Sequence, residues 1–357
     1  MLLKNLTFKL IKYIWFVMIN VEEADQNLDK SNYFFKIRDK IFFDAYNYNN
    51  YEDLKKNLKI NYYTVYLQTL LPVLILGVTC SISIFINNIT ANKLYVDFIH
   101  FLFLSILIGL IFHNMQNCIH GGVHYNLHPN KNISELISNT LGLFTGCEVK
   151  EARKIHLKHH TLNGTHDDPE NSYLYPLTIK KIVFYFTGLT IIQYALNYAE
   201  KKTDDLKIGF FTRIRMLFTA HRTASLLMHL IFLSLFYFYF KNLVLVMSWI
   251  VAYFIFFPFF KSLLNMLEHA EDKKIRISNN YKLKPINRNF GNDFFSKYIY
   301  GNCGSNMHAL HHWDATIHYT QLEKINESLK KSNIGNAVKK RDDTYLKTLN
   351  RISRIDC

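Results

Sequence analysis

The chain has 357 residues, of which 49% are hydrophobic and 15% aromatic, and its formal net charge is +14. A basic chain can bind nucleic acid, but long apolar runs separate the charged blocks here and argue against that class. The five cysteines form no CxxC pair, which argues against a disulfide framework, a zinc ribbon or an iron–sulfur cluster.

The N-terminal segment, residues 1–64, is predicted to lie in the cytoplasm or at the membrane interface. Its apolar stretch at residues 8–19 is only a dozen residues long and contains two lysines, so we expect an interfacial amphipathic helix. Two apolar runs follow, at residues 65–86 and 94–112. Each is about 20 residues long and can cross a bilayer, and the short connection between them predicts a tight helical hairpin.

A long polar block then leads to a second pair of apolar runs, at residues 224–240 and 243–260. Only two residues join these runs, so they too are predicted to form a hairpin. Residues 179–197 are a borderline case, which we interpret as a helix in the interface. The predicted membrane domain therefore covers residues 65–320 and has four spans, and a basic tail follows at 321–357.

The distribution of basic residues predicts the orientation of these spans. Residues 1–64 hold 10 Lys and Arg, residues 114–223 hold 13 and residues 261–357 hold 17, whereas each hairpin turn holds one. By the positive-inside rule, both termini and the long middle block are cytoplasmic.

Histidines gather in three clusters on this predicted cytoplasmic side. Two clusters share the spacing HxxHH, and the third, between two apolar stretches, is HxxxH. Imidazoles at positions i, i+3 and i+4 lie on one face of a helix, where they can converge on a metal. Eight imidazoles exceed the needs of one ion with four to six ligands, so the clusters predict two neighbouring ions. The predicted ligands are His120, His124, His156, His159, His160, His308, His311 and His312.

The residues around these clusters resemble the membrane fatty acid desaturase and hydroxylase superfamily. The stretch His124-Tyr-Asn-Leu-His-Pro-Asn is similar to the family sequence after the first cluster, and Leu141-Gly-Leu is similar to its approach to the second. Asp167-Asp-Pro follows the second cluster, and Asn306-Met-His opens the third. The resemblance covers about residues 65–320. It implies an all-α integral membrane protein with four transmembrane helices in two hairpins and a cytoplasmic helical cap that carries a di-iron site.

A fourth element, Asn265-Met-Leu-Glu-His269, resembles the NxxxH element of the family. The resemblance implies that His269 is a ninth ligand and that Asn265 reaches the metal directly or through water. His166 and Asp167, just after the second cluster, are candidates for supporting the ligands without binding the metal.

The chain departs from the family pattern at two places. Gly121 follows the first histidine where an acidic residue is usual, and Trp313-Asp-Ala replaces the usual apolar-x-Pro. These departures bear more on the identity of the substrate than on the prediction of the metal site. A rival frame, with Gln116 in place of the first histidine and His120 closing the motif, is disfavoured because the His120/His124 frame keeps the Pro-Asn spacing in register.

The resemblance implies an enzyme that uses two iron ions and dioxygen to introduce a cis double bond into an acyl chain. A hydroxylase or a carotenoid ketolase of the same superfamily is the alternative. Among other classes, a zinc hydrolase needs fewer ligands, a dihaem protein would pair histidines inside the spans, and a non-catalytic metal-binding protein would not need the flanking residues.

The expected substrate is a lipid or acyl chain from the membrane. The chain has no His-Pro-Gly-Gly haem motif, ferredoxin cysteines or flavin signature. A separate electron donor is therefore implied, either a ferredoxin or a b-type cytochrome with its reductase, and the basic cytoplasmic face suits an acidic partner.

Overall fold

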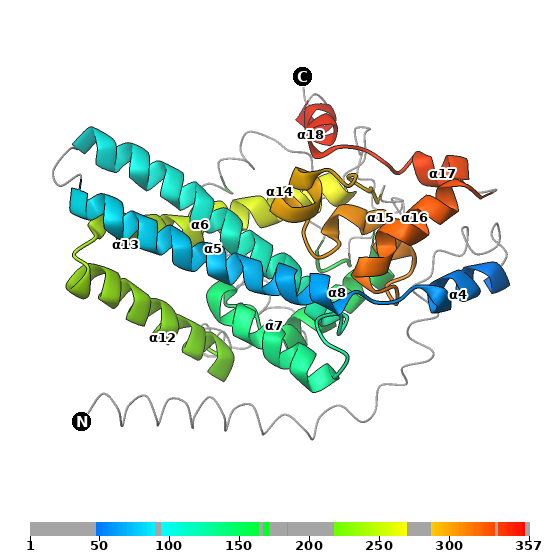
Figure 1. Cartoon of the computed structure of the whole chain (residues 1–357), viewed down its shortest axis with the longest axis horizontal. Helices are drawn as coiled ribbons and strands as arrows, with labels where there is room; N and C mark the ends of the chain where they lie inside the picture. The colour runs from blue at the N-terminus through cyan, green and yellow to red at the C-terminus, as the bar shows by residue number, and fades with distance from the viewer. Residues whose placement is uncertain are drawn as a thin grey trace. The chain divides into compact units, whose positions relative to one another are not determined.

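The computed structural model describes residues 48–89, 94–163, 167–170, 184, 218–269, 287–332 and 335–353. All of them belong to one compact unit, Ile37–Cys357. Its regular elements are helices (Figure 1). The described residues also include one isolated parallel bridge, between Asn289 and Asp342. The prediction of an all-α protein is confirmed.

Four helices are long and apolar enough to cross a membrane, and each overlaps one of the four predicted runs. The predictions of four spans and of an integral, multi-pass membrane protein are therefore confirmed. These helices cover Tyr62–Ile89, Tyr95–Val123, Ala220–Tyr239 and Leu243–His269. The predicted interfacial segment at 8–19 lies outside the described residues, as does that at 179–197 apart from residue 184.

The first two spans are α5 (Tyr62–Ile89) and α6 (Leu94–Val123). The third consists of α12 (Ala220–Ser234) followed by η2 (Leu235–Tyr239). The fourth consists of α13 (Leu243–Val251), η3 (Ala252–Phe256) and α14 (Phe257–His269) in succession. The segments η2 and η3 are π-helical. Large apolar side chains on all four spans are exposed, as a lipid-facing surface requires.

Two of these helices extend well beyond the apolar runs that predicted them. With 30 residues, α6 is about 45 Å long, and the 27 residues of Leu243–His269 give about 40 Å. The hydrocarbon core of a bilayer is about 30 Å thick. The last turns of both helices therefore reach past the hydrocarbon, and they carry His120 and His269 with them.

The centre of the bundle is α6, which packs against α5, α7, α13, η3 and α14. Phe112 of α6 lies in an aromatic cluster and meets Trp249 edge to face, with 5.2 Å between the ring centroids. The Trp249 indole Nε1 donates a hydrogen bond to His229 Nδ1 at 2.9 Å. His229 is buried and helps to hold this cluster together.

The cap consists of shorter helices at one end of the bundle. The first two are α7 (Lys131–Thr145) and α8 (Val149–Leu162). Asn130 caps the N-terminus of α7 by accepting hydrogen bonds from two backbone N–H groups. The remaining elements are α4 (Tyr48–Asn57), η4 (Phe295–Tyr300), η5 (Ser305–Met307), α15 (His308–Trp313), η6 (Tyr319–Gln321), α16 (Leu322–Lys330), α17 (Gly335–Lys339) and α18 (Tyr345–Ser353).

Residues that precede and residues that follow the predicted membrane domain in the sequence contribute to one hydrophobic core. Tyr51 of α4 and three apolar residues of α16 (Leu322, Ile325 and Leu329) are buried in the same hydrophobic cluster as the inner face of α6. Burial of these side chains stabilises the cap by about 1.5–3 kcal/mol for each large apolar residue.

Gly109 marks the closest approach of α6 to η3, and we predict that this position does not accept a side chain. An added Cβ would lie 2.5 Å from Phe256 Cβ. Overpacking of this kind costs about 1–3 kcal/mol, so Gly109→Ala should lower the thermal unfolding midpoint of the detergent-solubilised protein. Gly77→Ala is the matched control, because an added Cβ at Gly77 meets nothing within 4 Å. Equal midpoints for the two variants would contradict this packing.

Candidate metal centre

Four helices bring the predicted ligands together at the cap end of the bundle. His120 lies in the last turn of α6, and His124 follows just after the helix ends. The second sequence cluster is on α8 and the third on α15. His269 is the last residue of α14.

The ligands form two groups, each with its ligand atoms within 4.8 Å of one another. We call them the first and the second histidine cluster. The first consists of His120, His124, His156 and His311, and the second of His159, His269, His308 and His312. Each HxxHH motif thus contributes to both groups. Its three imidazoles share one face of the helix, but the i+3 and i+4 side chains flank position i and are about 100° apart around the helix axis, so they can reach different groups.

His160 lies between the two clusters. Its Nε2 is 2.9 Å from His156 Nε2 and 3.1 Å from His311 Nε2, both in the first cluster. Its ring stacks on His312 of the second cluster, with 4.2 Å between the centroids. All nine predicted histidines are therefore brought together.

The imidazoles face one another through Nε2. The Nε2 atoms of His120 and His311 are 3.0 Å apart in the first cluster, and those of His269 and His308 are 2.8 Å apart in the second. Buried Nε2 atoms of His124 and His312 find no hydrogen-bond partner among the described residues. Nitrogen lone pairs that converge away from water are stabilised by a cation, so the residues present fit a bound metal ion in each cluster.

Carboxylates and carboxamides lie on the opposite side of several rings, at Nδ1. Both carboxylate oxygens of the buried Asp168 are 2.9 Å from His159 Nδ1, and Glu170 Oε1 is 3.4 Å from His156 Nδ1. An acceptor at Nδ1 holds the ring hydrogen there and leaves the Nε2 lone pair for a metal.

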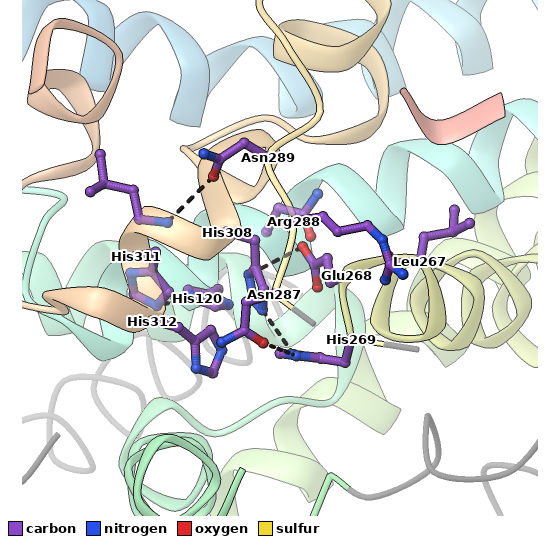
Figure 2. A network of polar contacts seen from close by, with 12 residues as sticks. His120, Leu267, Glu268, His269, Asn287, Arg288, Asn289, His308, His311 and His312 are labelled. Atoms are coloured by element: carbon purple, nitrogen blue, oxygen red, sulfur yellow. Dashed lines mark hydrogen bonds and ion pairs between the residues drawn. The ribbon is translucent and has the colours of Figure 1, made fainter. Parts of the chain in front are cut away.

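The second cluster has further partners of this kind, shown in Figure 2. Asn287 Oδ1 is 2.8 Å from His269 Nδ1, and Glu268 Oε1 is 3.3 Å from His308 Nδ1. Glu268 is buried, and it comes from the same α14 turn as His269. A buried carboxylate of this kind lowers the cost of concentrating positive charge in the site.

Burial sets the protonation of most of these rings. It lowers the pKa of His124, His311 and His312 well below the usual range, and the neighbouring imidazoles lower it further. His159 is the exception. Burial lowers its pKa, but the charges of Glu170 and Asp168 outweigh that effect and raise it. Neutral imidazole is the form that binds metal.

The predicted supporting residues have different positions. Asp167 is exposed, and the next residue, Asp168, is the one that contacts His159. His166 lies outside the described residues. Asn265 is buried on α14, one turn before His269. His120 and His124 both lie in the first histidine cluster, as the preferred frame expects. Gln116 donates to Cys147 Sγ at 3.5 Å.

Sequence reasoning missed the contacts of Asp314, one of the residues that depart from the family pattern. Tyr51 of α4 donates a hydrogen bond to its carboxylate at 2.7 Å, and the Lys55 ammonium lies 2.9 Å away. Burial raises the pKa of Asp314, but Lys55 and the hydrogen bonds outweigh that effect and lower it. The carboxylate therefore ties α4 to the end of α15. Lys55 and Asp314 are far apart in the sequence, so no local sequence pattern predicts this contact.

His113 comes directly after the second apolar run, where the sequence alone would suggest the membrane interface. It is fully buried, and its Nε2 lies 2.9 Å from the carbonyl oxygen of Tyr300. The reason is that α6 continues for ten residues past His113 and packs against the cap.

Comparison with known proteins gives one match. Residues 98–337 match the family model described as "Fatty acid desaturase". The matched segment covers most of the chain and includes all nine histidines of the two clusters. No curated protein and no solved structure matches the chain.

We predict that Asp168→Asn weakens metal retention. The variant keeps the shape of the side chain but removes the charge at His159 Nδ1, and loss of such a partner typically costs about 10–100-fold in metal affinity. Asp167→Asn, which changes the adjacent exposed residue in the same way, should have no effect. The measurement is metal content by mass spectrometry after dialysis against graded chelator concentrations. Equal retention by the two variants would contradict the proposed role of Asp168.

Proposed function

This chain belongs to the fatty acid desaturase family, an enzyme family, and from that membership we propose that it is a dioxygen-dependent di-iron enzyme that introduces a cis double bond into the acyl chain of a lipid. The observation that carries the proposal is the pair of histidine clusters, each with four imidazole nitrogens within 4.8 Å. Two adjacent nitrogen-rich sites suit a pair of iron ions better than one zinc ion, which takes three or four protein ligands.

In this proposal the first cluster and His160 hold one iron, and the second cluster holds the other. Asn265, one turn before His269, completes the second site directly or through a water molecule. When bound and reduced, the two ions supply the activation of dioxygen that removal of hydrogen from an unactivated methylene requires.

The remaining chemistry belongs to the side chains around the ligands. Asp168, Glu170 and Asn287 fix the orientation of three rings through Nδ1 and favour the tautomer that leaves Nε2 without hydrogen. Glu268 places a carboxylate 3.3 Å from a fourth ring, that of His308.

We place the site and both termini on the cytoplasmic side of the membrane. The support is the excess of Lys and Arg in residues 1–64, 114–223 and 261–357. The predicted organisation into an N-terminal segment (1–64), a membrane domain (65–320) and a basic tail (321–357) belongs to the same proposal.

Electrons come, in this proposal, from a separate protein, a ferredoxin or a b-type cytochrome with its reductase. The support is the absence of haem, flavin and ferredoxin motifs from the sequence together with its net charge of +14. A basic surface accelerates encounter with an acidic donor, and the rate of that encounter falls as salt is added.

Metal analysis of single-cluster variants tests the two-ion site. His124→Ala removes a ligand from the first cluster and His312→Ala removes one from the second. Each should retain about one iron per chain where the wild type holds about two. His128→Ala is the matched control, because His128 accepts a hydrogen bond from the backbone of Asn130 and lies outside both clusters. Loss of all metal from both variants, with the fold intact, would instead indicate a single shared site.

The reaction is tested by product analysis. Cells that express the wild type with a donor system should gain a new unsaturated acyl chain, detected by gas chromatography and mass spectrometry, and cells with His124→Ala should not. A hydroxylated chain or an oxidised carotenoid would assign the enzyme to the alternative reaction. No oxidised lipid from an iron-loaded wild-type protein would contradict the proposal.

A further inference from the structure

Of two neighbouring cavities, the inner one adjoins the first histidine cluster. The inner cavity has a volume of about 10 Å³ and is lined by His120, His124 and His311. The outer cavity has a volume of about 210 Å³ and lies between the start of α5 and the cap segments η4, η5 and η6. Gly304 and Tyr319 line both cavities. The inner cavity offers about the space that one water molecule needs, and the outer cavity has room for many.

The wall of the outer cavity is polar and carries little net charge. It presents the carboxamides of Asn61, Gln68, Asn292 and Asn306 and the hydroxyls of Thr64, Tyr298 and Thr320. Its two charged residues, Lys297 and Glu323, form an ion pair at 2.6 Å and neutralise each other. Gln68 is only 6% exposed, and its Oε1 has no hydrogen-bond partner among the described residues. A buried amide oxygen of this kind requires a water or another polar ligand beside it.

Tyr319 stands where the two cavities meet. Its buried hydroxyl lies beside the Cys303 thiol, which is only a weak hydrogen-bond partner. Gly304 permits this arrangement. It has a φ of +86°, and an added Cβ would lie 2.6 Å from Tyr319 Cβ. A hydroxyl can accept one hydrogen bond while it donates another, so it can pass a proton between waters on its two sides.

Desaturation requires such a route, and this step of the argument rests on the proposed function. For each double bond formed, the acyl chain loses two hydrogen atoms, and dioxygen takes up these atoms together with two electrons and two protons to give two water molecules. The electrons come from the donor protein. The two protons must enter a buried site, and the two waters must leave it.

We propose that the outer cavity is filled with water and serves as the path by which protons reach, and product water leaves, the first histidine cluster. The Tyr319 hydroxyl is the link between the two cavities. It accepts a proton from a water in the outer cavity as it donates its own proton to a water in the inner cavity, so its charge does not change.

The presence of water is tested by hydroxyl-radical footprinting with mass spectrometry, on full-length protein loaded with zinc so that iron generates no radicals. Met307 lines the outer cavity but is only 3% exposed, and Met115 is fully buried in the core of α6. Radiolysis of cavity water should oxidise Met307 several-fold faster than Met115. Equal rates for the two methionines would show a dry cavity and overturn the proposal.

The role of the hydroxyl is tested by Tyr319→Phe, with Tyr63→Phe as the control, because Tyr63 is 78% exposed and lines neither cavity. A positioned proton donor contributes about 10²-fold or more to a rate, and water can replace part of a relay, so Tyr319→Phe should lower turnover about tenfold. It should also raise hydrogen peroxide release per dioxygen consumed, while metal content, thermal midpoint and Met307 labelling stay at wild-type values. Tyr63→Phe should change none of these.

Unchanged turnover and peroxide release in Tyr319→Phe would overturn the relay. A different result separates the two proposals: a wild-type protein that labels Met307 rapidly but oxidises no lipid contradicts the desaturase function and leaves the water-filled cavity intact. Fast labelling together with the Tyr319→Phe defect supports both.

Discussion

The structure depends on the convergence of imidazole Nε2 atoms in a buried space. Nitrogen lone pairs that face one another without water are unfavourable unless a cation lies between them. Neighbouring acceptors strengthen the need for a cation. Asp168 and Asn287 hold the ring hydrogens at Nδ1, which leaves the lone pairs at Nε2. The ligands come from the ends of α6 and α14 and from α8 and α15. Metal binding therefore joins two membrane helices to two cap helices, and the site contributes to the stability of the cap as well as to its chemistry.

Membrane thickness decides where this centre lies. The first histidine of the HxxxH motif and the histidine of the NxxxH element both sit at the ends of helices that are longer than the hydrocarbon core. Close packing of α6 against η3, with Gly109 at the contact, keeps the two ends together. A site at this depth lies next to both the lipid phase and the aqueous phase. This position suits the proposed reaction, which takes an acyl chain from the bilayer and electrons and protons from the aqueous side.

The residues that depart from the family pattern have physical roles in this chain. Asp314 stands next to the third histidine motif and is bound by Tyr51 and Lys55 of α4, a helix that precedes the family match. At the other departure, Gly121, an added Cβ would already lie 3.3 Å from Leu127 Cδ2 and near the Tyr319 ring. A carboxylate at position 121 would therefore have to displace the side chains beside the inner cavity. These differences change the packing around the site but leave the set of histidines complete.

The sequence by itself determined the four spans, the all-α class and the histidines that come together, because hydrophobic run length and motif spacing are local properties. It also indicated His269, through the resemblance of residues 265–269 to a family element. Only the tertiary structure decided how the motifs divide between the two clusters, which acidic residue contacts His159, and that Asp314 holds α4. The direction in which Asp167 and Asp168 point depends on how the chain turns after α8, and the pairing of Tyr51 with Asp314 joins residues far apart in sequence. Such contacts follow from packing of the whole chain, which no local pattern records.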